Sequence, residues 1–177
     1  MTQRLSVRSD PSLERGAPAP AARVKRLRLY ELPELSLSVR AAPEICFQVI
    51  ASAGRTLERY ASGDRLVEFE AIVDGRRILT KELVRTEEPE RIDYEWVEGP
   101  LPLVEETIRI EPADNGDTRL RYEGRFAVAA PWPIRPFAAR SVSKKFAAVV
   151  NEHLVEAKDL AERRADRSRL YPRKVTR

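Results

Sequence analysis

The sequence predicts an α+β domain in which a curved antiparallel sheet of about six strands wraps around one long C-terminal helix. Three observations predict it. Short segments of alternating apolar and polar residues follow one another through most of residues 67–128. Turn sequences such as Asp74-Gly75 and Asp114-Asn115-Gly116-Asp117 separate these segments, as in successive hairpins. From about Arg135 the apolar residues recur instead at three- and four-residue spacing, which is typical of an amphipathic helix.

The length and composition fit a single domain with tails. The chain has 177 residues, of which 42% are hydrophobic and 34% are charged, and this suffices for one sizeable core. No apolar run approaches the ~18 residues that span a bilayer, and the first residues lack the apolar core of a signal peptide. We therefore expect a cytoplasmic protein that is at most peripheral to a membrane. Cys46 is the single cysteine and lies in an apolar helical segment, so we expect an inert core residue.

The net charge of +4 conceals basic ends around an acidic middle. Residues 1–28 carry a net charge of +5 and residues 163–177 one of +6, which leaves −7 for residues 29–162. We expect a disordered basic tail over residues 1–23, a folded domain over residues 24–166 and a basic tail over residues 167–177. Such tails suit anionic lipid head groups, RNA or an acidic protein, and tails that merely aid solubility are the equal alternative.

The expected elements begin with a strand and two short helices. Residues 24–32 are a basic extended arm or an early strand, and Leu35–Val39 alternates strictly, as the first strand proper would. Pro43 suits the first turn of a helix, because its missing N–H donor has no partner to lose there. This helix is expected to end by Gly54, and Thr56–Ala61 is expected to form a second short helix.

Five further strands are expected to follow as a meander. Alternation predicts them at about Val67–Val73, Arg77–Arg85, Ile92–Trp96, Val104–Ile110 and Leu120–Val128. The third and fourth of these are joined by Gly99-Pro100-Leu101-Pro102. Proline lacks the donor that a central ladder needs, and glycine permits a bend or bulge, so this join interrupts the pairing.

One long amphipathic helix is expected from about Arg135 until it frays near Ser168. Its expected apolar stripe comprises Val142, Phe146, Val149, Val150, His153, Ala157 and Leu160. A strongly twisted antiparallel sheet has one concave apolar face, and this helix is the only expected element long enough to cover it. The expected result is a cavity between the sheet and the helix.

Four places in the sequence carry a resemblance to a known superfamily. They are the junction Leu37–Phe47, the passage Pro89–Ile92 with Glu98–Leu101, the turn Gly116–Leu120 and the closing helix. Together they resemble the START-like or SRPBCC superfamily of polyketide cyclases and lipid-transfer proteins, and the second place is similar to its cyclase and coenzyme-Q-binding branches. The resemblance spans residues 35–161 and implies the helix-grip fold with a hydrophobic ligand. Residues 54–60 depart from the usual pattern, so the resemblance does not predict the rim of the cavity.

The predicted cavity is lined mainly by aromatic and aliphatic side chains, which suit a flat or isoprenoid ligand. The same side chains as plain core filling would give the same pattern. The predicted lining comprises Phe69, Tyr94, Trp96, Glu106, Ile108, Tyr122, Phe126, Phe146, Val150 and His153.

Glu106 and His153 are the two candidates for catalysis. Glu106 falls on an inward register, where burial would raise its pKa and make it a proton donor or a polar anchor for a ligand oxygen. A bulge at Gly99-Pro100 would instead turn it toward water, and Glu82 poses the same question. His153 is the single histidine, so a multi-histidine metal site is excluded, and a core histidine is favoured over a catalytic base.

The loop before the closing helix combines aromatic residues with cations. Trp132, Ile134 and Phe137 lie in the sequence beside Arg135, Arg140, Lys144 and Lys145. Exposed aromatic residues flanked by cations can dock the mouth of a cavity on an anionic membrane. A buried hinge loop is the alternative.

The favoured function is therefore the binding or transport of a hydrophobic small molecule, such as a lipid, an isoprenoid or a polyketide-like compound. A polyketide aromatase or cyclase, with Glu106 or His153 moving protons, is the first alternative. A protein- or RNA-interaction module that uses the basic tails is the second, and nucleic acid is the less favoured partner. The sequence shows no phosphate loop, metal-ligand cluster or activated nucleophile, so we expect no cofactor and no metal, and lean toward a protein that is not an enzyme.

Overall fold

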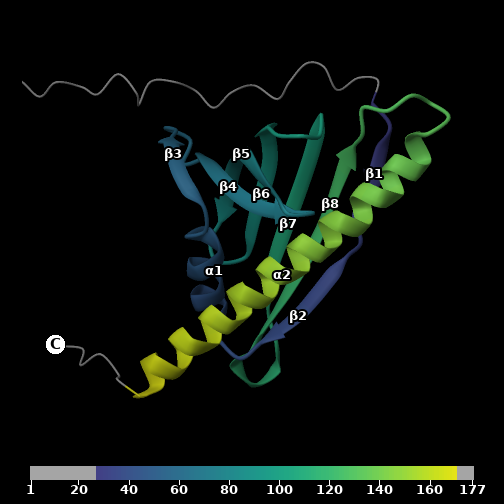
Figure 1. Ribbon diagram of the computed structural model, residues 1–177. Coiled ribbons are helices and arrows are strands. Elements are labelled where there is room, and N and C mark those ends of the chain that lie inside the picture. Colours follow the sequence, from purple (N-terminus) through teal and green to yellow (C-terminus); the bar gives the residue numbers. More distant parts are fainter. Residues whose placement is uncertain (1–26, 171–177) are drawn as a thin grey trace, which may run out of the picture.

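A computed structural model describes residues 27–170 as one antiparallel sheet with two helices (Figure 1). The elements along the chain are β1 (Leu29–Glu31), β2 (Leu35–Val39), α1 (Pro43–Ala51), β3 (Arg55–Arg59), β4 (Arg65–Val73), β5 (Arg76–Glu87), β6 (Arg91–Glu98), β7 (Leu103–Pro112), the short 3-10 turn η3 (Asp114–Gly116), β8 (Thr118–Ala127) and α2 (Arg135–Leu170).

The strands form one eight-stranded sheet in the order β1-β8-β7-β6-β5-β4-β3, with β2 also paired to β8. β1 and β2 occupy successive parts of the same edge of β8, since Leu29 pairs with Ala127 and Leu35 pairs with Tyr122. The sheet curves around α2, which crosses its concave side diagonally, while α1 lies against the C-terminal half of α2 (Figure 1). This is the helix-grip architecture that the sequence predicts.

Two of the eight strands account for the difference from the six predicted ones. Residues 29–31 form β1, so the early-strand alternative for residues 24–32 is the correct one within the described part of the chain. The predicted helix at Thr56–Ala61 is wrong, because Arg55–Arg59 forms the edge strand β3. A helix this short would be marginally stable by itself, whereas pairing to β4 gives the segment a ladder of backbone hydrogen bonds. Arg55 adds an ion pair to Glu68 at 2.7 Å.

The helix α2 is longer than any other element, and at 36 residues it extends about 54 Å. Its inward stripe comprises Ala139, Val142, Phe146, Val150, Leu154, Ala157, Ala161 and Ala165. The three alanines at its C-terminal half leave room for α1 to approach closely. His153 and Leu160 of the predicted stripe are exposed instead, because the three- and four-residue steps pass through Leu154 and Ala161.

Polar contacts fasten α2 to the sheet at both ends of the grip. Near its C-terminal half, Glu162 accepts hydrogen bonds from the backbone N–H and the guanidinium of Arg40, and Lys158 donates to the carbonyl of Ser38 at 2.7 Å. Near its N-terminal half, Lys145 forms an ion pair with Asp74 in the β4–β5 turn. The helix is therefore held to the sheet at two separated places. Between these places, side chains of α2 and of the sheet face one another.

The core confirms the expectation for Cys46, which is 1% exposed and packs among apolar residues. Burial raises the pKa of its thiol, which is the direction expected of an inert cysteine. No helix among residues 27–170 is both long and apolar enough to cross a membrane. The predicted tail over residues 1–23 lies outside the described residues, whereas residues 167–170 of the other predicted tail continue α2.

Candidate functional site

The concave face of the sheet is set by the pairing register of its central strands. Tyr94 of β6 lies opposite Glu106 of β7, and Trp96 of β6 lies opposite Glu82 of β5. Side chains that lie opposite one another in an antiparallel pair project from the same face. Since Trp96 packs against Phe146 of α2 with ring centroids 5.7 Å apart, this shared face is the one that α2 covers.

Nine of the ten predicted lining residues lie on this face or on the inward side of α2. Phe69 contacts Tyr94 edge to face at 5.9 Å, and Tyr122 and Ile108 are paired neighbours on β8 and β7. Phe126 is fully buried near the start of α2, and Phe146 and Val150 pack onto the core from the helix. The exception is His153, whose side chain is exposed because it lies beside the inward stripe. It therefore does not face the sheet.

Glu106 faces inward, so of the two orientations considered for it, the inward one is observed. The hydroxyl of Tyr122 donates to Oε1 at 2.7 Å, and Nε1 of Trp96 donates to Oε2 at 3.2 Å. β7 pairs with β8 without a register shift from Leu103 to Pro112, and the irregularity lies instead in the pairing of β5 with β6. The Gly99-Pro100 join therefore leaves the register of Glu106 intact.

Gly99 is required by the same cluster. A Cβ atom at this position would lie 2.5 Å from Cε3 of Trp96, closer than real Cβ contacts allow. The indole therefore lies directly over the backbone of the join, and a residue without a side chain makes this possible. The close approach holds the Trp96 ring where its Nε1 reaches Glu106.

Glu82 is the second carboxyl group on this face, and its residue is 7% exposed. The hydroxyl of Thr80 donates to its Oε1 at 2.6 Å. Neither Glu82 nor Glu106 has a lysine, arginine or histidine partner among residues 27–170, and the charged group that acts on Glu82 is Glu106. The face thus combines aromatic rings with two carboxyl groups that form no ion pair in the described part of the chain; Arg65, opposite Val84 on the same face, donates instead to the carbonyl of Ala51.

Burial raises the pKa of both carboxyl groups, because the charged form loses its hydration. The pKa of Glu82 rises to about 8, first through burial and then through repulsion from Glu106. The pKa of Glu106 rises to about 7 through burial, while the hydrogen bonds from Tyr122 and Trp96 act in the opposite direction. Near neutral pH the two groups therefore hold at least one proton between them, and they titrate as a pair.

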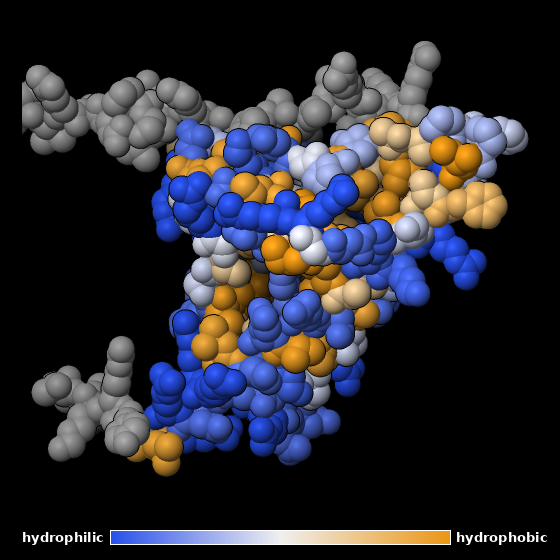
Figure 2. Space-filling model, viewed as in Figure 1, coloured by the Kyte–Doolittle hydropathy of each residue, from blue (hydrophilic) through white to orange (hydrophobic). Residues whose placement is uncertain are grey.

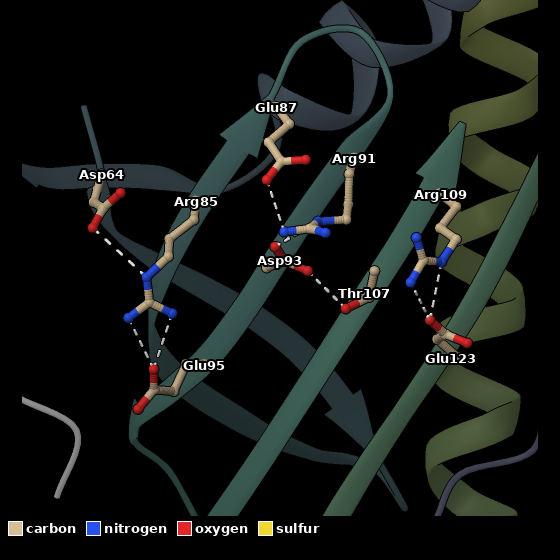
Figure 3. Close-up of polar contacts among 9 residues, drawn as sticks. All are labelled: Asp64, Arg85, Glu87, Arg91, Asp93, Glu95, Thr107, Arg109 and Glu123. Atoms are coloured by element: carbon tan, nitrogen blue, oxygen red, sulfur yellow. Dashed lines mark hydrogen bonds and ion pairs between the residues drawn. The ribbon is translucent and has the colours of Figure 1, made fainter. Parts of the chain in front are cut away.

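The opposite face of the sheet has a different chemistry (Figure 3). Arg85 contacts Glu95 at 3.0 Å, and Arg109 contacts Glu123 at 3.1 Å, so cations and carboxylates alternate across neighbouring strands. Arg91 joins Glu87 and Asp93 in the same way. Most of these convex-face charges are neutralised in pairs, in contrast to the carboxyl groups of the concave face.

Two grooves lie beside the start of α2. The first has a volume of about 250 Å³ and is lined by Tyr30, Glu31, Phe126, Pro136, Ala139, Arg140 and Ser143. The second has a volume of about 360 Å³ and is lined by Arg28, Tyr30, Trp132, Pro133, Arg135 and Pro136. Neither groove reaches Glu82 or Glu106, but Phe126 at the first groove lies on the same face of β8 as Tyr122.

The predicted loop residues are exposed rather than buried in a hinge. Trp132 is 80%, Phe137 75% and Ile134 55% exposed.

Among residues 27–170 no three His, Cys, Asp or Glu side chains lie close enough together to hold a metal ion. Sequence reasoning missed Arg28, Tyr30 and Thr80; the Thr80-x-Glu82 spacing on one strand face was a signal for the last of these.

Residues 36–162 match the family described as polyketide cyclase / dehydrase and lipid transport, which is more than half of the chain. The chain belongs to this family. Solved structures agree in fold within the START and SRPBCC superfamily, so the predicted superfamily and the helix-grip fold are both confirmed. The coenzyme-Q-binding branch of the prediction is not confirmed.

Three solved structures illustrate the similarity of this family member to others. A protein from Thermus thermophilus has a TM-score of 0.65 at 14% identity, over 75% of this chain and 97% of its own. A START superfamily protein from Mycobacterium smegmatis has a TM-score of 0.58 at 18% identity, over 78% and 99%. The Zhui aromatase/cyclase from a Streptomyces species has a TM-score of 0.61 at 19% identity, over 80% and 96%. These identities carry the fold alone. No curated protein gives a significant match.

Proposed function

We propose that this protein binds a hydrophobic small molecule between the concave face of the sheet and α2. The observation that carries the proposal is the pair of buried carboxyl groups, Glu82 and Glu106, on a mainly aromatic and aliphatic face. Family membership supports the same class of ligand. A lipid, an isoprenoid or a polyketide-like compound would place its apolar body against the rings and a polar oxygen at the carboxyl groups.

Burying these two carboxyl groups on the concave face costs free energy. Moving a carboxyl group from water into an apolar surrounding is unfavourable unless its hydrogen bonds are replaced. Here Thr80, Tyr122 and Trp96 replace some of them, and the remainder would be made by a ligand. Leucine or valine would fill the same positions with more favourable burial, so two glutamates on this face favour a binding role over core filling.

The first groove is the proposed route of entry. Phe126 and the first turns of α2 line it, and Phe126 lies on the same face of β8 as Tyr122. A small outward movement of the helix start would extend the groove from Phe126 toward Tyr122 on the concave face.

A ligand-detection experiment tests this function. The protein would be purified without detergent, examined by native mass spectrometry and solvent extraction, and titrated with an environment-sensitive hydrophobic dye. We expect a co-purified apolar compound or saturable dye binding that Glu106→Gln weakens. Glu105→Gln is the matched control, because Glu105 is adjacent in sequence but lies on the convex face with Arg125. Absence of both a compound and dye binding would refute the proposal.

A second candidate is an aromatase or cyclase-type enzyme, with one observation in its favour. The pKa of Glu106 lies near 7, and Tyr122 and Trp96 orient its carboxyl group, which suits general acid–base chemistry near neutral pH. With an enolisable polyketide mimic as substrate, Glu106→Gln would lower turnover by about 100-fold or more, whereas Glu105→Gln would not. Equal turnover by the two variants would exclude Glu106 as the proton-transfer group.

Several finer expectations remain predictions. A coenzyme-Q-like isoprenoid is one ligand within the proposed class. Peripheral contact with an anionic membrane rests on Trp132, Ile134 and Phe137. A protein- or RNA-interaction module that uses the basic tails depends on residues outside the described part of the chain. If deletion of both tails changed no binding, this hypothesis would be rejected.

A further inference from the structure

The largest exposed apolar side chains of the described chain are concentrated where α2 begins. Trp132, Phe137 and Ile134 are 80%, 75% and 55% exposed, and they lie within six residues of one another. Figure 2 shows hydrophobic side chains gathered at this end, around the loop that joins β8 to α2. We call this region the Trp132 end. Exposed apolar groups of this size that are close together typically mark a contact surface.

The backbone of the Trp132 end is held in place, so the exposure is built into the fold. The N–H groups of Ile134 and Arg135 both donate to the carbonyl of Pro131, at 3.2 and 3.0 Å, and the helical hydrogen bonds begin with Ala138 donating to Ile134 at 3.0 Å. Three prolines at positions 131, 133 and 136 restrict the backbone further. The indole and phenyl rings therefore project outward from a fixed turn.

Four cations at the start of α2 and in the adjoining groove have no carboxylate partner in the described part of the chain. Arg28, Arg135, Arg140 and Lys144 form no ion pair within residues 27–170, whereas the arginines of the convex face in Figure 3 are paired. Arg135 uses Nε to donate to the carbonyl of Ala130 at 2.9 Å, which leaves its two terminal nitrogens as donors. Glu31 is the carboxylate beside this end, at the first groove. The local charge is thus positive on a domain whose middle is acidic.

The second groove places two of these cations around one space. Arg28 and Arg135 both line it, and the guanidinium of Arg28 lies over the ring of Tyr30, 5.4 Å from the ring centre. The hydroxyl of Tyr30 is buried and has no hydrogen-bond partner among the described residues. The positive end of the dipole of the 36-residue helix α2 lies at the same place, which favours an anion. Two guanidinium groups at a helix N-terminus fit a phosphate group.

We propose that the Trp132 end docks on the surface of an anionic lipid bilayer. Trp132 and Phe137 enter the interfacial region, and the groove between Arg28 and Arg135 takes a lipid phosphate. Arg140 and Lys144 follow Phe137 at helical spacing and face the anionic surface alongside it. This arrangement combines apolar insertion with electrostatic attraction, the two contributions that hold peripheral proteins at membranes. It does not depend on the ligand proposed for the concave face.

The test is cosedimentation of the full chain with vesicles of phosphatidylcholine alone and of phosphatidylcholine mixed with phosphatidylserine. We expect binding to the mixed vesicles that added salt weakens. Trp132→Ala with Phe137→Ala would lower the partition coefficient by about tenfold or more. Arg28→Gln with Arg135→Gln would lower it by about fivefold per arginine at low salt. Should Arg135→Gln unfold the protein, Arg140→Gln with Lys144→Gln gives the same test on exposed positions.

Matched controls separate this surface from the rest of the chain. Leu170→Ala removes a side chain that is 73% exposed at the opposite end of α2, and it should leave the partition coefficient unchanged. Arg59→Gln with Arg119→Gln removes two cations that form no ion pair within residues 27–170. This double variant should lower the partition coefficient only by the general effect of the lost net charge. The emission of Trp132 should shift to the blue on vesicle binding, and Trp132→Phe should remove that shift. Equal binding by the wild type and the Trp132→Ala, Phe137→Ala variant, or no preference for anionic vesicles, would overturn the proposal.

Discussion

Replacing Glu82 by glutamine is expected to stabilise the protein in a pH-dependent way. In the folded protein the pKa of Glu82 is raised from 4.5 to about 8, first through burial and then through repulsion from Glu106. Glutamine keeps the shape and can still accept the hydrogen bond of Thr80, but it carries no charge. The variant therefore isolates the free energy of burying this carboxylate.

The pH dependence of this stabilisation follows from the upward shift of the Glu82 pKa. Below about pH 4.5 the carboxyl group is protonated in both the folded and the unfolded chain, and the wild type carries no penalty. As the pH rises toward about 8, the folded state retains a proton that the unfolded state has released, so the free energy of unfolding falls. A pKa difference of this size corresponds to at most about 5 kcal/mol, because a tenfold change in an equilibrium constant corresponds to about 1.4 kcal/mol. Since Glu106 shares the effect, we expect a gain of a few kcal/mol.

Urea denaturation of the wild type and Glu82→Gln would be compared at about pH 5 and about pH 9. The two proteins should differ little at the lower pH, and the variant should be more stable at the higher one. Glu95→Gln is the matched control, since Glu95 belongs to the adjacent strand but faces the convex side with Arg85; it should change stability by less than about 1 kcal/mol. A variant that is less stable than the wild type at about pH 9, or equally shifted at both pH values, would refute the reasoning.

Three further predictions concern side-chain packing and the hydrogen bond from Trp96 to Glu106. Gly99→Ala should destabilise the fold by about 1–3 kcal/mol in urea denaturation, because its Cβ would meet the Trp96 ring at 2.5 Å; an unchanged midpoint would show that the indole is not held there. Trp96→Phe keeps the ring contact with Phe146 but removes the donor to Glu106, so the pKa of Glu106, followed by NMR titration, should rise further; a fall would contradict the hydrogen bond. Ala161→Leu should lower stability by about 1–3 kcal/mol by overpacking the α1–α2 contact, whereas its exposed neighbour Leu160→Ala should be nearly neutral; equal effects would contradict the observed helix face.

Much of the fold could be predicted because its strands are buried on one face. Alternation at Leu35–Val39 and at residues 104–110 matches β2 and β7, and Pro43 opens α1 as expected. Edge strand β3 could not be predicted in this way. Its residues are mostly exposed, so no apolar period marks it, and only its pairing with β4 decides its conformation.

The candidate site divides along similar lines. Two-residue periodicity offered an inward position for Glu106 beside an outward one that a bulge would give, and the unbroken β7–β8 pairing decided for the inward one. The exposure of His153 does not follow, because neighbouring positions on a long helix differ by about 100° and the direction of α2 across the sheet selects which stripe is covered. The depth of Glu82 does not follow either, since its burial depends on strands β4 and β6 on either side of it.

The sequence by itself determined the order of the elements, the antiparallel meander, the closing helix and the family, because local periodicity and turn chemistry carry that information. Only the tertiary structure decided which carboxyl groups meet and where the cations cluster. Glu82 and Glu106 come from different strands and share a face through register, and Arg28 and Arg135 line one groove although they are far apart in sequence. The physical reason is that charge burial and proximity depend on long-range pairing, which no local pattern encodes.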